Sequence, residues 1–266
     1  MMPMAEDRDA MNSGNGLVAP ILRLVNLRKT REQSEVRFEL HVPAFHLHAG
    51  QFVAVVGESG CGKSTLLDLL ALVLKPTHCK TFWLAGGGGA GRGVDVWQLW
   101  NAGAEHKLAE IRRRDLGYVL QTGGLLPFLS VAENIHLPLR ILGIPIDHAE
   151  IDDLAECIDI RAVLGKKPQH LSGGQRQRAA ILRALVHNPR LILADEPTAA
   201  VDKNRARAIV QDFKRLACDQ GATIVMVTHD YQLVRDLADV TYTFDVTPIS
   251  ATGIQSVCRL RGKGIE

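Results

Sequence analysis

The most restrictive feature of the chain is a glycine-rich loop at residues 57–65, with the sequence GESGCGKST. It fits the pattern G-x-x-x-x-G-K-[ST], follows an apolar run at residues 51–56 and precedes the leucine-rich stretch at residues 66–72. This order predicts a buried parallel strand, a loop and a helix. In such a unit the N–H groups of the loop and the helix N-terminus face phosphate groups together. A glycine turn before a core helix is the alternative, which only further motifs can exclude.

The loop also supplies a cation and two hydroxyl groups. We expect Lys63 to contact the β- and γ-phosphates of a nucleotide, Ser64 to ligate Mg²⁺, and Thr65 to lie near the α-phosphate. The glycines allow the backbone to approach the phosphates closely. The residues predicted to bind nucleotide in this segment are Gly57, Glu58, Ser59, Gly60, Cys61, Gly62, Lys63, Ser64 and Thr65.

Two other apolar runs end in polar residues that catalysis can use. The run RLILADEP places Asp195 and Glu196 at a strand end, and the run ATIVMVTH delivers His229 in the same way. Ligands bind at the carboxyl edge of a parallel sheet, so we expect Asp195 to hold Mg²⁺ and Glu196 to polarise an attacking water. Alone, the carboxylate pair fits a solvated turn equally well, and a single histidine is more often structural.

The sequence contains two further motifs: a second glycine motif, LSGGQ, at residues 171–175, and GYVLQ, which ends at Gln121. With them, the chain resembles the nucleotide-binding subunits of ABC transporters over residues 22–245, in both the order and the spacing of its motifs. The segments at residues 124–134 and 193–198 are most similar to the branch that works with lipoprotein-release, macrolide-export and cell-division permeases. The resemblance assigns the Walker A loop to residues 57–65, the Q-loop to Gln121, the signature to residues 171–175, Walker B to residues 191–196, the D-loop to Asp202 and the H-loop to His229.

The resemblance implies an α/β fold. It is a P-loop NTPase (RecA-like) core with a mostly parallel sheet, an antiparallel β subdomain that begins near residue 22, and an inserted α-helical subdomain that carries the signature. The predicted organisation is a disordered tail at residues 1–16, a nucleotide-binding domain at 17–245 with its helical part at 121–185, and a C-terminal strand or tail at 246–266. Residues 203–219 read as an amphipathic helix.

The signature at residues 171–175 predicts a second anion-binding helix start, in addition to the phosphate loop. Ser172 is well placed to cap a helix that begins at Gly173, so that the free N–H groups of the helix present positive partial charge to an anion. In the family, two subunits dock head to tail, and Ser172 and Gly174 of one would contact the γ-phosphate held by Lys63 of the other. A capped helix with a glycine turn has the same local geometry. The resemblance thus adds Ser172, Gly173, Gly174, Gln175 and Asp202 to the nucleotide site.

The activity implied is ATP hydrolysis with ATP and Mg²⁺. The catalytic residues would be Glu196, His229, Lys63 and Gln121, and the metal would be held by Ser64, Gln121 and Asp195. The partners implied are a second copy of the chain and an integral membrane permease, with the chain itself cytoplasmic and peripheral on the inner or plasma membrane. The longest apolar stretch, at residues 66–74, is far too short to cross a bilayer, so the transport path would belong to another chain.

A soluble ABC ATPase that acts on nucleic acid or the ribosome is the rival class. The single-domain length, the formal net charge of +2 and the lack of a second cassette argue against it, and no nucleic-acid partner is expected. The apolar segment at residues 123–138 fits a groove for a short helix of a permease, and it fits plain core equally well.

Two departures from the family pattern limit these expectations. Gapless alignment to the phosphate loop places Thr30 where relatives carry the aromatic residue that stacks on adenine, with Phe38 as a substitute, so GTP use stays open. A glycine-rich stretch at residues 86–93 is expected to form a mobile loop without a second phosphate site.

Overall fold

The computed structural model describes residues 20–33, 36–86, 93–199, 201, 203–219, 221–250 and 252–262. The tail predicted at residues 1–16, most of the glycine-rich stretch at residues 86–93, and Asp202 lie outside the described residues.

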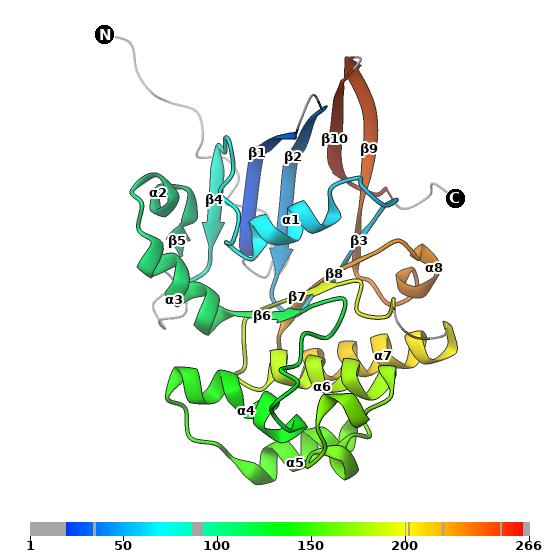
Figure 1. Ribbon diagram of the computed structural model, residues 1–266. Helices are drawn as coiled ribbons and strands as arrows, with labels where there is room; N and C mark the ends of the chain where they lie inside the picture. Colours follow the sequence, from blue (N-terminus) through cyan, green and yellow to red (C-terminus); the bar gives the residue numbers. More distant parts are fainter. Residues whose placement is uncertain are drawn as a thin grey trace, which may run out of the picture.

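A mixed ten-stranded sheet runs through the described part of the molecule, in the order β5-β4-β1-β2-β10-β9-β3-β8-β7-β6 (Figure 1). Strands β9, β3, β8, β7 and β6 are parallel neighbours, whereas β1 is antiparallel to β2 and β4. The strands are β1 (Pro20–Gln33), β2 (Val36–His48), β3 (Phe52–Val56), β4 (Thr81–Leu84), β5 (Val94–Asp95), β6 (Leu116–Val119), β7 (Leu191–Asp195), β8 (Thr223–Thr228), β9 (Val240–Ser250) and β10 (Gly253–Leu260).

The sheet confirms the predicted α/β class with a mostly parallel core. It also shows that the antiparallel strands are not separate from this core. Strand β10 pairs parallel with β2 and antiparallel with β9, so the antiparallel strands and the parallel core form one continuous sheet. Strand β9 also continues across residue 245, where the sequence placed the end of the nucleotide-binding domain. The C-terminal hairpin is therefore an internal part of the sheet, because its backbone groups pair on both sides.

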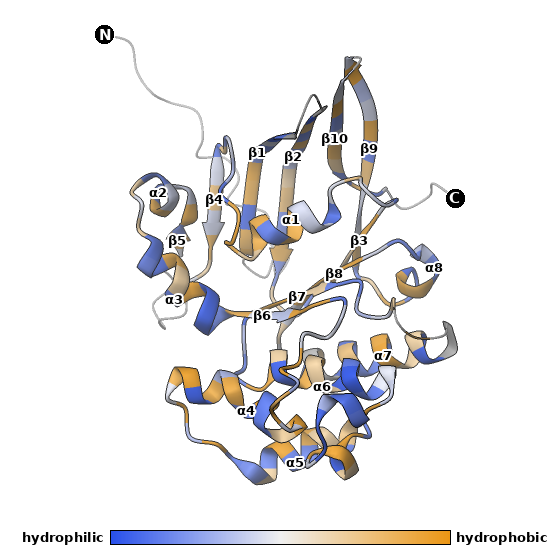
Figure 2. Ribbon diagram, in the orientation of Figure 1, coloured by the Kyte–Doolittle hydropathy of each residue, from blue (hydrophilic) through white to orange (hydrophobic). Residues whose placement is uncertain are grey.

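Helices cover both faces of the parallel strands, and three of them form the predicted insertion between β6 and β7 (Figure 1). Helices α4 and α6 of this insertion each carry hydrophobic and hydrophilic residues, as the hydropathy colours show (Figure 2). The helix predicted at residues 203–219 is confirmed as α7. The helices are α1 (Lys63–Leu70), α2 (Val96–Asn101), α3 (Glu105–Asp115), α4 (Val131–Leu142), α5 (His148–Cys157), α6 (Gly173–Leu185), α7 (Lys203–Asp219) and α8 (Tyr231–Val234), with short 3₁₀ turns at Arg161–Val163 and Pro168–His170.

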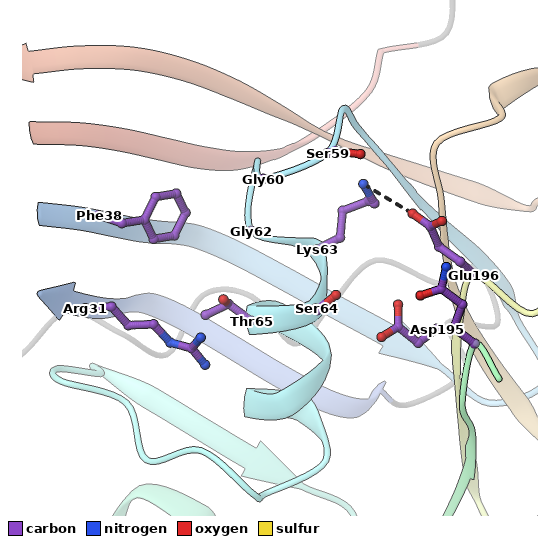
Figure 3. A pocket seen from close by; sticks show the side chains of 11 residues that line it. Arg31, Phe38, Ser59, Gly60, Gly62, Lys63, Ser64, Thr65, Asp195 and Glu196 are labelled. Carbon is purple, nitrogen blue, oxygen red and sulfur yellow. Dashed lines mark ion pairs between the residues drawn. The ribbon is translucent and has the colours of Figure 1, made fainter. Parts of the chain in front are cut away.

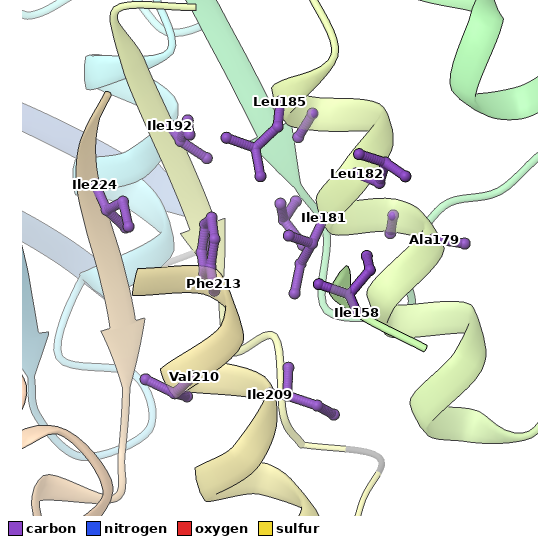
Figure 4. Packing of buried hydrophobic residues seen from close by; sticks show 14 of the residues in the cluster. Ile158, Ala179, Ile181, Leu182, Leu185, Ile192, Ile209, Val210, Phe213 and Ile224 are labelled. Atoms are coloured by element: carbon purple, nitrogen blue, oxygen red, sulfur yellow. The ribbon is translucent and has the colours of Figure 1, made fainter. Parts of the chain in front are cut away.

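Two apolar clusters, one on each face of the sheet, fix the position of these helices. Successive side chains of β3 alternate between them: Ala54 belongs to one cluster and Val55 to the other. On one face α1 packs over the sheet, and on the opposite face α6 and α7 pack against β7 and β8, with Phe213 between the two layers (Figure 4). Because the strand ends carry the predicted site, this packing sets where the site lies.

In the described part of the chain, no helix has both the length and the apolar character that crossing a membrane requires.

Candidate active site

The phosphate loop connects β3 to α1, as predicted. Helix α1 begins at Lys63, and its N-cap residue Gly62 has no side chain to accept hydrogen bonds from the first N–H groups. Those groups are therefore left for an external acceptor such as a phosphate oxygen. The helix is held in place by Leu66, Leu67 and Leu69, which are completely buried. The N-terminus of a firmly packed helix thus presents N–H groups that a phosphate could accept hydrogen bonds from.

This helix N-terminus lines a pocket of about 680 Å³ (Figure 3), a size in the usual range for a small-molecule site. The pocket combines residues from the phosphate loop with residues from the ends of β6 and β7. Its walls are Arg31, Phe38, Ser59, Gly60, Gly62, Lys63, Ser64, Thr65, Gln121, Asp195 and Glu196. The structure therefore brings together the loop, Gln121 and the carboxylate pair, which are far apart in the sequence.

Lys63 is the cation at the centre of this pocket. Its Nζ donates hydrogen bonds to the carbonyl oxygens of Gly57 and Glu58, at 2.8 and 2.9 Å. It also forms an ion pair with Glu196, at 3.5 Å between Nζ and Oε1 (Figure 3). The side chain of Lys63 is only 6% exposed, so its charge acts with little screening by water.

Glu196 is held between two predicted catalytic residues. Besides Lys63, its carboxylate contacts His229, at 3.1 Å between Oε2 and Nδ1. Its backbone has a positive φ of 42°, which is unfavourable for a residue other than glycine, and its N–H donates to the carbonyl of Val227. Such local strain often accompanies function, and the Glu196 side chain is only 17% exposed, so it does not lie in a freely solvated turn.

The predicted metal ligands, Ser64, Gln121 and Asp195, all line the pocket. Burial, and then the neighbouring Glu196, raise the pKa of Asp195 above its usual value. These groups are oxygen donors, which suit Mg²⁺ when it takes its other ligands from phosphate and water. Among the described residues, no group of three or more His, Cys, Asp or Glu side chains is arranged so that it could hold a metal ion by itself.

Thr30, which the gapless alignment placed at the adenine-stacking position, does not line the pocket. The Thr30 N–H donates to the Thr77 hydroxyl at 3.0 Å. Its neighbour Arg31 lines the pocket and pairs across the hairpin with Phe38, which lines it too. Because adjacent residues of a strand point to opposite faces, a shift of one residue exchanges Thr30 for Arg31. A β-carbon on Gly62 would lie 3.1 Å from the Phe38 ring, so the ring borders the loop.

The signature residues confirm the predicted helix start but lie apart from this pocket. The Ser172 hydroxyl accepts from the Gln175 N–H at 3.2 Å, and the Gln175 side chain accepts from the Ser172 N–H at 3.0 Å. This capping box begins α6 at Gly173. None of residues 172–175 lines the pocket that holds Lys63. The predicted nucleotide-binding residues therefore fall into two separate groups within one copy.

The segment at residues 123–138 divides between the two predicted alternatives. Val131 and Ile135 of α4 are fully buried in the core, whereas Phe128 is 67% exposed. Asn134, which is not among the residues predicted from the sequence, shapes the turn before α4. Its side chain accepts from the Leu126 N–H and donates to the carbonyls of residues 126, 129 and 130. An asparagine among apolar helix residues was the available signal.

Comparison with known proteins shows the family of the chain. The model of the ABC transporter family matches residues 40–199 of the chain. The chain belongs to the ABC transporter family. The cassette is 39% identical over 215 residues to the uncharacterized ABC transporter ATP-binding protein YvcR of Bacillus subtilis, covering 79% of this chain and 78% of that protein. It is also 39% identical over 195 residues to the lipoprotein-releasing system ATP-binding protein LolD of Idiomarina loihiensis, covering 73% and 80%.

A solved relative has the same fold. The dimeric structure of MJ0796, a bacterial ABC transporter cassette, matches with a TM-score of 0.67 and 32% identity, over 84% of this chain and 93% of the other. A second structure of MJ0796 shows a dimer in a post-hydrolysis state bound to ADP and Pi. The present cassette is therefore an ATP-binding ATPase of the transporter class, as the motifs predicted.

Proposed function

We propose that two copies of the cassette dock head to tail around two ATP molecules, hydrolyse them, and so drive a separate membrane permease. The observation that carries the proposal is the separation of the two predicted groups of nucleotide-binding residues. Lys63 lies in the pocket, whereas the capped start of α6 lies outside it. A second copy in head-to-tail contact completes the site, because Ser172 and Gly174 then face the γ-phosphate held by the other copy. The MJ0796 dimers are consistent with such an assembly.

In this proposal the residues of the pocket act mainly through charge. Lys63 in the pocket and His229, which contacts Glu196 beside it, face the charge that develops on the γ-phosphate oxygens, and Glu196 orients the attacking water. Ser64, Gln121 and Asp195 would hold Mg²⁺, which would neutralise part of the negative charge of the nucleotide phosphates. ATP bridges both copies and its products do not, so ATP closes the dimer and hydrolysis releases it. Asp202 stays a predicted contact between the two sites.

The permease is proposed from exposed apolar side chains in the segment at residues 120–144, which contains Gln121 and α4. Leu120, Phe128, Ile141 and Ile144 are 42–67% exposed, and such residues on a monomer are typical of a contact surface when they gather. Two relatives, the pyoverdine export protein PvdT and the macrolide export protein MacB, are named as ATP-binding/permease proteins. We propose that the cassette is peripheral on the cytoplasmic face of the membrane, with no nucleic-acid partner.

Affinity purification of the Glu196→Gln variant with ATP from gently solubilised cells tests this proposal. We expect a polytopic membrane protein to copurify, and we expect much less of it with Glu196→Gln/Phe128→Ser, because a polar residue there removes an exposed apolar contact. The ATPase activity of Phe128→Ser alone should stay near that of the wild type, since Phe128 lies outside the pocket. Copurification of ribosomes or nucleic acid without a membrane protein would contradict the proposal and favour the rival class.

We further propose that the Phe38 ring stacks on the base of the nucleotide. Replacing Phe38 with alanine should raise the KM for ATP about tenfold, because loss of stacking on an aromatic ring costs about 1–3 kcal/mol. The KM for GTP should rise by a similar factor, since stacking does not distinguish bases. Steady-state kinetics with both nucleotides measure the effect, and Thr30→Ala serves as the matched control. An effect of Thr30→Ala as large as that of Phe38→Ala would contradict the assignment.

A further inference from the structure

Arg183 joins the signature helix to the turn that carries Gln121. From the last turn of α6, its Nη1 donates to the carbonyl of Gly124 at 2.6 Å, and its Nη2 donates to the carbonyl of Gly123 at 3.0 Å. Both glycines have a positive φ, 75° and 57°, and Gly123 closes the turn through a hydrogen bond from its N–H to the carbonyl of Leu120. One guanidinium therefore holds two consecutive carbonyls, the first of them two residues after Gln121.

Arg183 is partly buried, and among the described residues no carboxylate forms an ion pair with it. Burial lowers the pKa of this guanidinium from its usual value, and within the described structure no carboxylate contributes to offset that effect. The two backbone carbonyls are its hydrogen-bond acceptors. A partly buried cation is unfavourable unless its hydrogen bonds are satisfied, so the position of the turn and that of the side chain depend on each other.

The packing beside Arg183 is also close. A β-carbon on Gly117 of β6 would lie 2.2 Å from the carbonyl oxygen of Ala184, so α6 touches the strand that leads to Gln121 at backbone distance. About one turn before Ala184 in α6, the Ala180 side chain lies near Gly123. Helix α6, strand β6 and the glutamine turn consequently pack closely against one another.

We propose that Arg183 is a positioning residue that links the signature helix to Gln121, so that contact of α6 with the nucleotide of the second copy sets the place of Gln121 in its own pocket. The two ends of this connection, Ser172 and Arg183, are about 16 Å apart along the helix at 1.5 Å per residue. The inference rests on the proposed head-to-tail dimer, because only there does the start of α6 meet a γ-phosphate. It assigns communication between the two sites to a contact inside each copy.

A double-mutant cycle on kcat tests the link. Arg183→Met and Gln121→Ala should each lower kcat about tenfold, since a small misplacement of a catalytic group has effects of this size or larger. If Arg183 acts through Gln121, the double variant should stay within about twofold of Gln121→Ala. The affinity of Arg183→Met for a fluorescent ATP analogue should stay within about threefold of the wild type, because the phosphate loop is intact. Multiplication of the two effects to about a hundredfold would overturn the proposal.

Arg183→Lys keeps the cycle decisive if Arg183→Met does not fold. Lysine retains the charge but replaces the planar guanidinium with a single ammonium group, so we expect kcat of Arg183→Lys to fall about threefold. The double variant Arg183→Lys/Gln121→Ala should have the same kcat as Gln121→Ala alone. Arg215→Met is the matched control: Arg215 donates to the carbonyl of Cys157 at 2.7 Å, away from the glutamine turn. Its effect should multiply with that of Gln121→Ala. A wild-type chain without ATPase activity would overturn the proposed function itself, whereas an active wild type with multiplicative effects overturns the role of Arg183 alone.

Discussion

Replacing Glu196 with glutamine is expected to stop steady-state ATP turnover and to hold two copies together in the presence of ATP. The change removes the carboxylate that we propose orients water, and general-base groups of this kind contribute about 10²–10⁴-fold to the rate. Glutamine has nearly the same size, so Lys63 and the phosphate loop keep their positions. We expect binding to persist while hydrolysis falls by at least about a hundredfold. Size-exclusion chromatography with ATP and with ADP measures the dimer directly.

Asp236→Asn provides the control for this variant. Asp236 forms ion pairs with two arginines, Arg207 and Arg235, outside the pocket. Asp236→Asn therefore removes one negative charge, as Glu196→Gln does, without a change in the pocket. Its turnover should match that of the wild type. If the Glu196→Gln protein stays monomeric in ATP, the closure model fails. If it hydrolyses ATP at the rate of the Asp236→Asn control, Glu196 has no catalytic role.

The second large effect is expected for Lys63→Ala, which should lose most of its affinity for nucleotide. Hydrogen bonds to a charged group contribute about 1.5–3 kcal/mol, which corresponds to about 10–100-fold in the dissociation constant. The carbonyls of Gly57 and Glu58, which Lys63 now satisfies, would also lose a donor. Hydrolysis should fall below detection, because Lys63 faces the charge that develops in the reaction. Fluorescence titration and a phosphate-release assay measure the two effects.

Lys75→Ala makes the same change of charge on the surface. The Lys75 ammonium donates to the carbonyl of Trp100 and does not line the pocket, so nucleotide affinity should be unchanged. Thermal unfolding of both variants separates a binding defect from a folding defect, since Lys63→Ala leaves Glu196 without its nearest cation. Unchanged hydrolysis by a folded Lys63→Ala protein would remove this residue from the proposed mechanism.

Local patterns explain why much of the site was predictable from the sequence. The phosphate loop, the strand end at Asp195 and the capped start of α6 each depend on residues within a few positions of one another. The amphipathic repeat at residues 203–219 also predicts both ends of α7. The carboxyl edge of a parallel sheet then brings Gln121, Asp195 and Glu196 to one pocket.

Pairing between distant segments explains what the sequence could not provide. The pocket position of Arg31 in place of Thr30 depends on the register between β1 and β2, which the alternation of one strand alone does not define. The bonds from Arg183 join residues 59 and 60 positions apart. No local pattern signals such contacts, because an arginine on an amphipathic helix ordinarily faces water.

The place of β10 in the sheet has a consequence for biosynthesis. Strand β10 is the last strand of the sheet in chain order, yet it lies between β2 and β9 and joins the antiparallel strands to the parallel core. The Ser256 hydroxyl on this strand donates to the carbonyl of Cys61 at 2.5 Å, so β10 also supports the phosphate loop. A chain emerging from the ribosome can complete neither the sheet nor this support before residue 260 has been added. Cotranslational ATP binding is therefore expected to begin only after β10 has been synthesised, well after the Walker motifs, and the intermediates are expected to expose open strand edges to chaperones.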